Sequence, residues 1–147
     1  MKGKLAGMIV TLACVATTVP AEPVTPARGT ALRAELMDTV RAHVVNDLGA
    51  PIEFVVNTLL VEDGRGLAML SAQRPGGGAI DISQTPLVLR DGIAAWEIDG
   101  PEVVAFLYLQ SGNWYVDDYS VGATDAWWAG GPFCREYASV LPAQVCP

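Results

Sequence analysis

The fold is decided by residues 30–49, which read TALRAELMDTVRAHVVNDLG. Between Ala31 and Leu48 apolar side chains recur every four residues, a spacing typical of an amphipathic helix with one apolar stripe. Thr30 is a good N-cap residue, and Gly49 followed by Pro51 is a strong stop signal. We therefore expect a helix over 31–48 that buries a stripe made of Leu32, Leu36, Met37, Val40, Val44 and Leu48.

After this helix the apolar period shortens to two. Residues 52–60 are rich in β-branched and aromatic side chains, and one face is more polar than the other, which predicts a strand. The sequence EDGRG at 62–66 predicts a turn. Residues 67–73 are then the returning strand of a hairpin.

A second hairpin is expected from 103–109 and 114–121, joined by the turn sequence SGN at 111–113. Residues 103–109 are apolar on both faces, so we place this strand in the interior of the sheet. Between the hairpins lies a long connector, residues 74–101. Loops of this length are usually functional or poorly ordered.

One helix followed by four antiparallel strands predicts the α+β class, in which an N-terminal amphipathic helix packs on a four-stranded sheet that curves around it. Residues 22–30 contain two prolines and a glycine and are expected to form a flexible arm. Residues 31–147 are expected to form a single domain. The side chains expected between helix and sheet are Leu36, Val40, Phe54, Val56, Phe106 and Trp114.

The N-terminus has the pattern of a cleavable secretory signal. Lys2 and Lys4 precede an apolar run over 5–16 that is too short to span a bilayer. The following small residues fit a peptidase site, so we expect cleavage after Ala21 and a periplasmic or secreted mature protein. The alternative is that Cys14 becomes a lipidated cysteine.

The charge of the chain limits its partners. Sixteen acidic residues face nine basic ones, a formal net charge of −7, and loss of the two signal lysines takes it to −9. Such a surface repels phosphate backbones and anionic lipids, so we expect no nucleic acid and no stable membrane association. The expected partner is a protein, peptide or small ligand, and a cationic peptide or basic protein suits this charge best.

Cys134 and Cys146 remain after signal removal and lie close together in sequence. In an oxidising compartment such a pair most simply forms a disulfide, which ties the C-terminal tail and stabilises by about 3 kcal/mol. Neither cysteine has the C-x-x-C context of a redox site.

The order helix, hairpin, long excursion, hairpin resembles the cystatin-like and NTF2-like group of small curved-sheet proteins. A narrower resemblance, to small exported bacterial proteins with no agreed activity, covers most of the mature chain. It rests on LGAPIEFVV at 48–56, QRP at 73–75, ID at 80–81, TP at 85–86, GNWYV at 112–116 and VGATD at 121–125. Topology alone does not license a function.

Few residues suggest catalysis. His43 and Asp47 are four apart and can meet on the helix flank, but nothing in the sequence places Ser71 or Ser120 opposite them. We expect His43 to pack its ring on the sheet, and we assign no catalytic residue.

The acidic residues suggest an alternative hypothesis, in which the protein is an enzyme that uses a buried carboxylate. NTF2-like enzymes use a buried aspartate whose pKa is raised by an apolar pocket, and Asp81, Glu97, Asp99 and Asp125 fall in loops or at strand ends. Neighbouring acids in a strand, Asp117 and Asp118, are expected on opposite faces. One histidine and two disulfide cysteines cannot make a zinc site, so no metal and no cofactor is expected.

The strongest local pattern is GATDAWWAGGP at 122–132. Thr124 and Asp125 are suited to a turn, and Trp127 and Trp128 offer the large rigid surfaces common at binding hot spots. Alternatively, the tryptophans cover the open edge of the core under the tail.

These patterns lead to two hypotheses. The first is a non-enzymatic periplasmic binding or protein-interaction module that uses the residues Thr124, Asp125, Trp127 and Trp128, with Arg74 and Asp81 of the connector as further candidates. The second is a small NTF2-like hydrolase or isomerase that uses a buried carboxylate.

Overall fold

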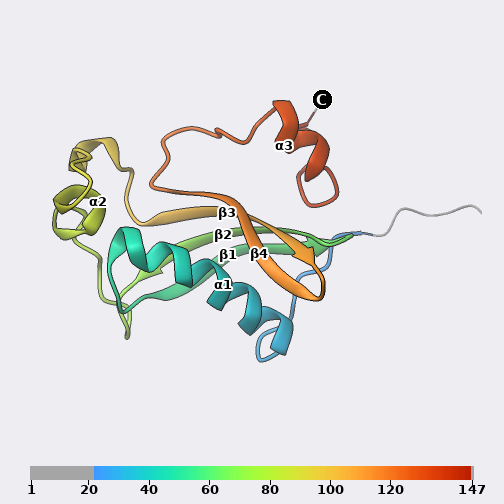
Figure 1. Cartoon of the computed structure of the whole chain (residues 1–147), viewed down its shortest axis with the longest axis horizontal. Coiled ribbons are helices and arrows are strands. Elements are labelled where there is room, and N and C mark those ends of the chain that lie inside the picture. Colours follow the sequence, from blue (N-terminus) through green and yellow to red (C-terminus); the bar gives the residue numbers. More distant parts are fainter. Residues whose placement is uncertain (1–21, 147) are drawn as a thin grey trace, which may run out of the picture.

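The structure is a computed structural model that describes residues 22–146 (Figure 1). The expected signal peptide and the alternative at Cys14 lie outside these residues. This part of the chain is of the α+β class, with one long helix and a four-stranded antiparallel sheet. In the described part, no helix is both long and apolar enough to span a membrane.

The long helix, α1, runs from Ala31 to Leu48, as predicted. The Thr30 hydroxyl accepts a hydrogen bond from the backbone N–H of Arg33 at 3.3 Å, and Gly49 ends the helix with a φ of 74°. The predicted stripe faces the sheet, where Leu36, Met37, Val40, Val44 and Leu48 are buried. The four-residue spacing and the two end signals together therefore predicted this element.

Both predicted hairpins form, and the four strands follow each other across the sheet in the order β1-β2-β3-β4. Strand β3 is interior, as its apolar faces indicate. The bounds are β1 Glu53–Glu62, β2 Arg65–Gln73, β3 Glu102–Gln110 and β4 Asn113–Val121.

Each edge strand contains an irregularity that reverses its alternation. In β1, Val56 pairs with Leu70 and Thr58 with Met69, which leaves Asn57 as an extra residue. In β4, the pairs Phe106–Asp118 and Leu107–Val116 leave Asp117 extra.

The bulge in β4 changes which side chains share a face. Val116 and Tyr119 both pack on the helix-side core, although strict alternation would place them on opposite faces. The expected alternation of Asp117 and Asp118 is therefore wrong across this bulge. Asp117 accepts a hydrogen bond from the hydroxyl of Tyr137 at 2.9 Å, so it faces the C-terminal segment.

The sheet is covered on both faces, which sequence reasoning did not predict. On the face opposite α1, the segment after β4, with the short helix α3 (Gly131–Glu136), packs over a second core (Figure 1). Its buried side chains are Leu67, Phe106, Tyr137, Val140 and Leu141.

Phe106 corrects the predicted core list. It is fully buried, but in the second core, because Val103, Ala105 and Leu107 of β3 point toward α1 and Phe106 alternates with them. Of the other residues expected between helix and sheet, Leu36 and Val40 are fully buried there. Phe54, Val56 and Trp114 are half-buried against the same core.

The connector between the hairpins is not structureless. It contains the 3₁₀ turns η1 (Ile82–Gln84) and η2 (Ala95–Glu97) around a one-turn helix, α2 (Pro86–Leu89). The expected arm at 22–30 is tied to the sheet at one point, where Val24 and Val61 exchange two backbone hydrogen bonds of 2.9 Å.

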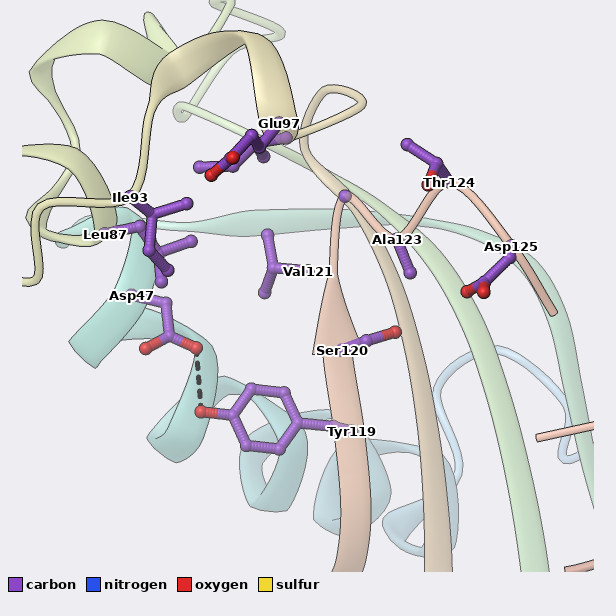
Figure 2. Close-up of a pocket in the computed structure, with 12 residues that line it drawn as sticks. Asp47, Leu87, Ile93, Glu97, Tyr119, Ser120, Val121, Ala123, Thr124 and Asp125 are labelled. Carbon is purple, nitrogen blue, oxygen red and sulfur yellow. Dashed lines mark hydrogen bonds between the residues drawn. The ribbon is translucent and has the colours of Figure 1, made fainter. Parts of the chain in front are cut away.

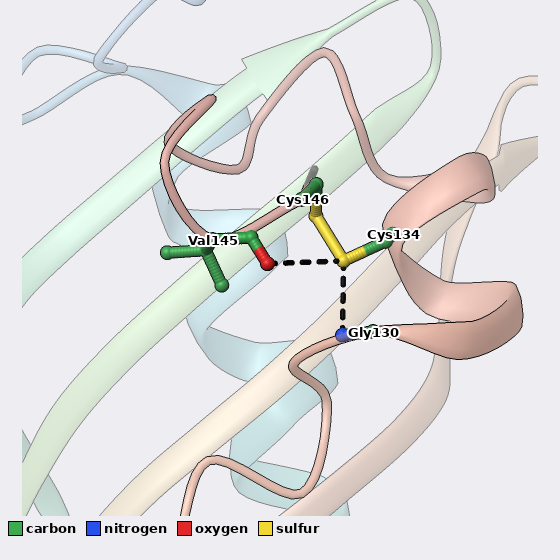
Figure 3. The surroundings of a disulfide bond; sticks show 4 residues. All are labelled: Gly130, Cys134, Val145 and Cys146. Carbon is green, nitrogen blue, oxygen red and sulfur yellow. Dashed lines mark hydrogen bonds between the residues drawn. A yellow bond between two sulfur atoms is a disulfide. The ribbon is translucent and has the colours of Figure 1, made fainter.

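The sulfur atoms of Cys134 and Cys146 lie at disulfide distance, with Cα atoms 5.1 Å apart, as the sequence predicted (Figure 3). The backbone N–H of Gly130 donates to the Cys134 sulfur at 3.0 Å, and the Val145 carbonyl lies 3.5 Å away. The pair ties the last residues to α3, and thus to the second core.

Candidate functional site

The two connector residues named from sequence have local structural roles. The Arg74 guanidinium donates to the carbonyl oxygens of Leu48 at 2.8 Å, Pro51 at 3.0 Å and Gly49, and so caps the C-terminus of α1. The Asp81 carboxylate accepts from the N–H and hydroxyl of Ser83 at 3.0 and 2.7 Å and caps η1.

The two tryptophans of the 122–132 loop pack inward. The ring centroids of Trp127 and Trp128 lie 5.8 and 6.1 Å from that of Phe106, and both side chains are half-buried in the second core. The Trp127 indole N–H donates to the hydroxyl of Ser120 at 2.6 Å. This arrangement matches the alternative in which the tryptophans cover the core.

Thr124 and Asp125 separate from those tryptophans and line a cleft of about 490 Å³. We call it the connector cleft, because the connector forms one side and the residues after β4 the other (Figure 2). Figure 2 shows Asp47, Leu87 and Ile93 across Val121 from Thr124 and Asp125. The lining residues are Asp47, Leu87, Ile93, Glu97, Ile98, Tyr119, Ser120, Val121, Gly122, Ala123, Thr124 and Asp125.

Gly122 brings the two sides of the cleft together. Its N–H donates to the Glu102 carbonyl at 2.7 Å, and its own carbonyl accepts from the N–H of Asp99 at 2.8 Å. Its φ is 59°, and a Cβ there would lie 2.7 Å from the carbonyl oxygen of Gly100. Only glycine therefore fits this approach without displacing the connector.

A tyrosine and an aspartate are fixed in the cleft wall. The Tyr119 hydroxyl of β4 donates to the Asp47 carboxylate of α1 at 2.7 Å (Figure 2). Burial first, and then the hydrogen bond to Asp47, raises the pKa of the Tyr119 phenol, which stays neutral at physiological pH. His43 packs its ring on the sheet, as expected, with its centroid 5.5 Å from that of Tyr119, while the Asp47 carboxylate is bonded to the Tyr119 hydroxyl.

The cleft has an acidic surface. Asp47, Glu97 and Asp125 contribute carboxylates, and no cationic side chain is among the residues that line it. The nearby Arg90 is engaged by Asp91, with bonds of 2.6 and 2.7 Å, and by the carbonyl of Asn46 at 2.9 Å. The Asp91 hydrogen bond, together with the charge of Asp47, raises the pKa of Arg90, which remains charged.

Beside the cleft, the connector exposes three large apolar side chains that the sequence did not single out. The Trp96 side chain in η2 is 83% exposed, Leu89 is 67% exposed, and Ile93, which also lines the cleft, is 37% exposed. We call these three residues the connector surface. The sequence signal that could have indicated these residues is an apolar stretch within a long loop. Other elements often do not cover such a loop, so its apolar side chains can remain exposed.

Ser120 and Ser71 are not placed as nucleophiles. Ser120 accepts from Trp127, and Ser71 donates to the Glu102 carboxylate at 2.8 Å on another part of the sheet. Within residues 22–146 no group of three or more histidine, cysteine, aspartate and glutamate side chains is arranged to hold a metal ion.

Comparisons with protein-family models, with curated proteins and with solved structures found no match to this chain. Fold class alone does not determine activity, so what this chain does depends on the chemistry of its site.

Proposed function

We propose that this chain is an exported, non-enzymatic binding module that holds a partner protein or peptide at the connector surface and the adjoining cleft. The observation that carries the proposal is the exposure of Trp96, at 83% of its surface, on a connector held by backbone hydrogen bonds. Exposed tryptophan is costly in water and common at binding hot spots. The disulfide-distance cysteines and the absence of a spanning helix among residues 22–146 are compatible with export.

Charge supports a basic partner. The cleft presents carboxylates from Asp47, Glu97 and Asp125, while the neighbouring Arg90 is held by Asp91. A segment that carries lysine or arginine beside an apolar side chain would satisfy both parts of the site. Nucleic acid and anionic lipid are unfavourable partners for the same reason.

A specific observation also keeps the enzymatic alternative in view. Asp47 is half-buried and hydrogen-bonded in the cleft, as a carboxylate that moves protons in a small hydrolase or isomerase would be. However, the cleft is open, and Glu97 and Asp125 are exposed to solvent, whereas a raised carboxyl pKa needs an apolar, enclosed environment. Binding is therefore the better-supported function, and the resemblance to the cystatin-like and NTF2-like group stays a proposal based on element order.

Site-specific cross-linking tests the proposal. Trp96 is replaced by a photoreactive benzophenone amino acid in the exporting cell, and Tyr115, a 43% exposed aromatic residue on β4, is replaced in the same way as the control. We expect a discrete protein adduct at position 96 that is absent at 115 and is reduced by Glu97→Gln. Equal adducts at both positions, or none at 96, would contradict the proposal.

A further inference from the structure

The arginines of this acidic chain are unevenly distributed. Residues 22–146 contain seven arginines. Three of them, Arg28, Arg33 and Arg41, line a single cavity of about 340 Å³ between α1 and β1. We call it the arginine pocket; its other lining residues are Met37, Phe54, Val55 and Val56.

Helical spacing builds one wall of this pocket. Arg33, Met37 and Arg41 lie at intervals of four residues and share one side of α1. Arg28 reaches the pocket from the segment before the helix. Phe54 and Val56 form the opposite wall, because both point to the helix side of β1.

The pocket has an excess of positive charge. Elsewhere Arg65 is paired with Glu136 and Arg90 with Asp91, whereas within the described part of the chain the three pocket arginines have one ion-pair partner among them, Asp38, which contacts Arg41. Three guanidinium groups around one cavity repel each other, and a bound anion would offset this repulsion.

Most guanidinium donors in the pocket have no partner among residues 22–146. Arg33 donates to the carbonyl of Pro26 at 3.0 Å, and Arg41 donates to the carbonyl of Ile52 at 3.2 Å and to Asp38. Arg28 makes no side-chain hydrogen bond within residues 22–146. Each guanidinium carries five N–H donors. Arg33 and Arg41 are therefore held in place and still have N–H groups that can donate to a ligand.

The remaining walls are apolar. The Arg41 guanidinium lies 5.4 Å from the centre of the Phe54 ring, which orients both groups. Met37 and Val56 line the interior, and Val55 is 47% exposed at the rim. A ligand that fills the pocket therefore needs an apolar group as well as an anion.

We propose that the arginine pocket binds a small organic oxyanion, a carboxylate or phosphate monoester that carries one apolar group. The oxyanion accepts hydrogen bonds from Arg28, Arg33 and Arg41, and the apolar group packs on Phe54 and Met37. The volume of about 340 Å³ is at the small end of ligand pockets, which span about 300–1,000 Å³. This site shares no lining residue with the connector cleft.

Calorimetric titration of the mature chain tests this site with four probes: phenyl phosphate, benzoate, inorganic phosphate and benzyl alcohol. We expect phenyl phosphate or benzoate to bind more tightly than inorganic phosphate and benzyl alcohol, and the stronger of the two identifies the oxyanion. Arg28→Gln should weaken that binding about tenfold or more, as loss of a charged hydrogen bond does. The matched control is Arg135→Gln, an exposed arginine of α3 outside the pocket, which should bind like the parent.

Arg28 is the decisive position, because its side chain holds no other element in the part of the chain that the structure describes, and its replacement should leave the fold intact. Phe54→Leu should weaken phenyl phosphate but not inorganic phosphate, which separates the apolar contact from the charge. Binding of inorganic phosphate as tight as that of phenyl phosphate would overturn the proposal. So would an unchanged affinity in Arg28→Gln, or no binding of either aromatic anion by the parent chain.

Discussion

Phe106→Ala tests the second core most directly. The Phe106 ring is fully buried. Its centroid lies 4.7, 5.1, 5.8 and 6.1 Å from the ring centroids of Tyr137, Phe133, Trp127 and Trp128, respectively. Truncation of a buried phenylalanine costs about 3–5 kcal/mol. We expect the upper part of this range, because Phe106 loses packing against four rings and the tail is the only layer over that face among the described residues.

Urea denaturation followed by tryptophan fluorescence measures the change in the free energy of unfolding. The control is Leu109→Ala on the same strand; its side chain is 42% exposed, so it should cost less than about 1 kcal/mol. In Phe106→Ala the segment after β4 should also become sensitive to proteases before the sheet does. A loss below about 1 kcal/mol, or no change in protease sensitivity, would show that the C-terminal segment does not depend on this core.

Three other outcomes follow from the described contacts. Replacing Cys134 by serine should lower stability by at most about 3 kcal/mol, and intact-mass measurement of the parent should show a two-hydrogen gain only on reduction; a free thiol before reduction would exclude the bond. Trp127→Ala should lower the melting temperature, whereas Trp96→Ala should change stability by no more than about 0.5 kcal/mol; thermal melts that rank the two variants in the opposite order would reverse their assigned roles. Burial, and then a carboxylate hydrogen bond, raises the pKa of the Tyr119 and Tyr137 phenols above the usual value of 10.0. Their contribution to stability should therefore be complete below pH 10 and decline as the pH rises through the folded pKa. Phenolate absorbance during alkaline titration measures this, and ordinary titration of both tyrosines would contradict it.

The sequence predicted the helix and both hairpins because their signals are local. Thr30 and Gly49 mark the ends of a four-residue period, and each hairpin combines a turn with strands of suitable composition. Strict alternation failed where single extra residues, Asn57 and Asp117, enter the edge strands. No local sequence signal marks such a bulge. The side of the sheet that each later residue faces therefore could not be predicted from odd and even positions.

The candidate site was harder to predict because it joins distant segments. Thr124 and Asp125 do line the connector cleft, but their neighbour Trp127 packs in the second core. The turn sequence does not indicate that these neighbouring residues face different sites. Trp96 was missed because an apolar stretch looks the same whether other elements cover it or not. The arginine pocket depends on a pairing of α1 with β1 that composition does not reveal.

The position of the C-terminal layer in the chain has a consequence for biogenesis. A polypeptide emerges N-terminus first, so α1 and all four strands are available before residues 123–146 arrive. Until then Phe106 and Leu67 lie on an uncovered apolar face, although the helix-side core can already form. The nascent chain therefore passes through a stage in which one face of the sheet is covered by α1 and the other exposes apolar side chains that can aggregate. A chaperone that binds unfolded chains would be most useful during that stage.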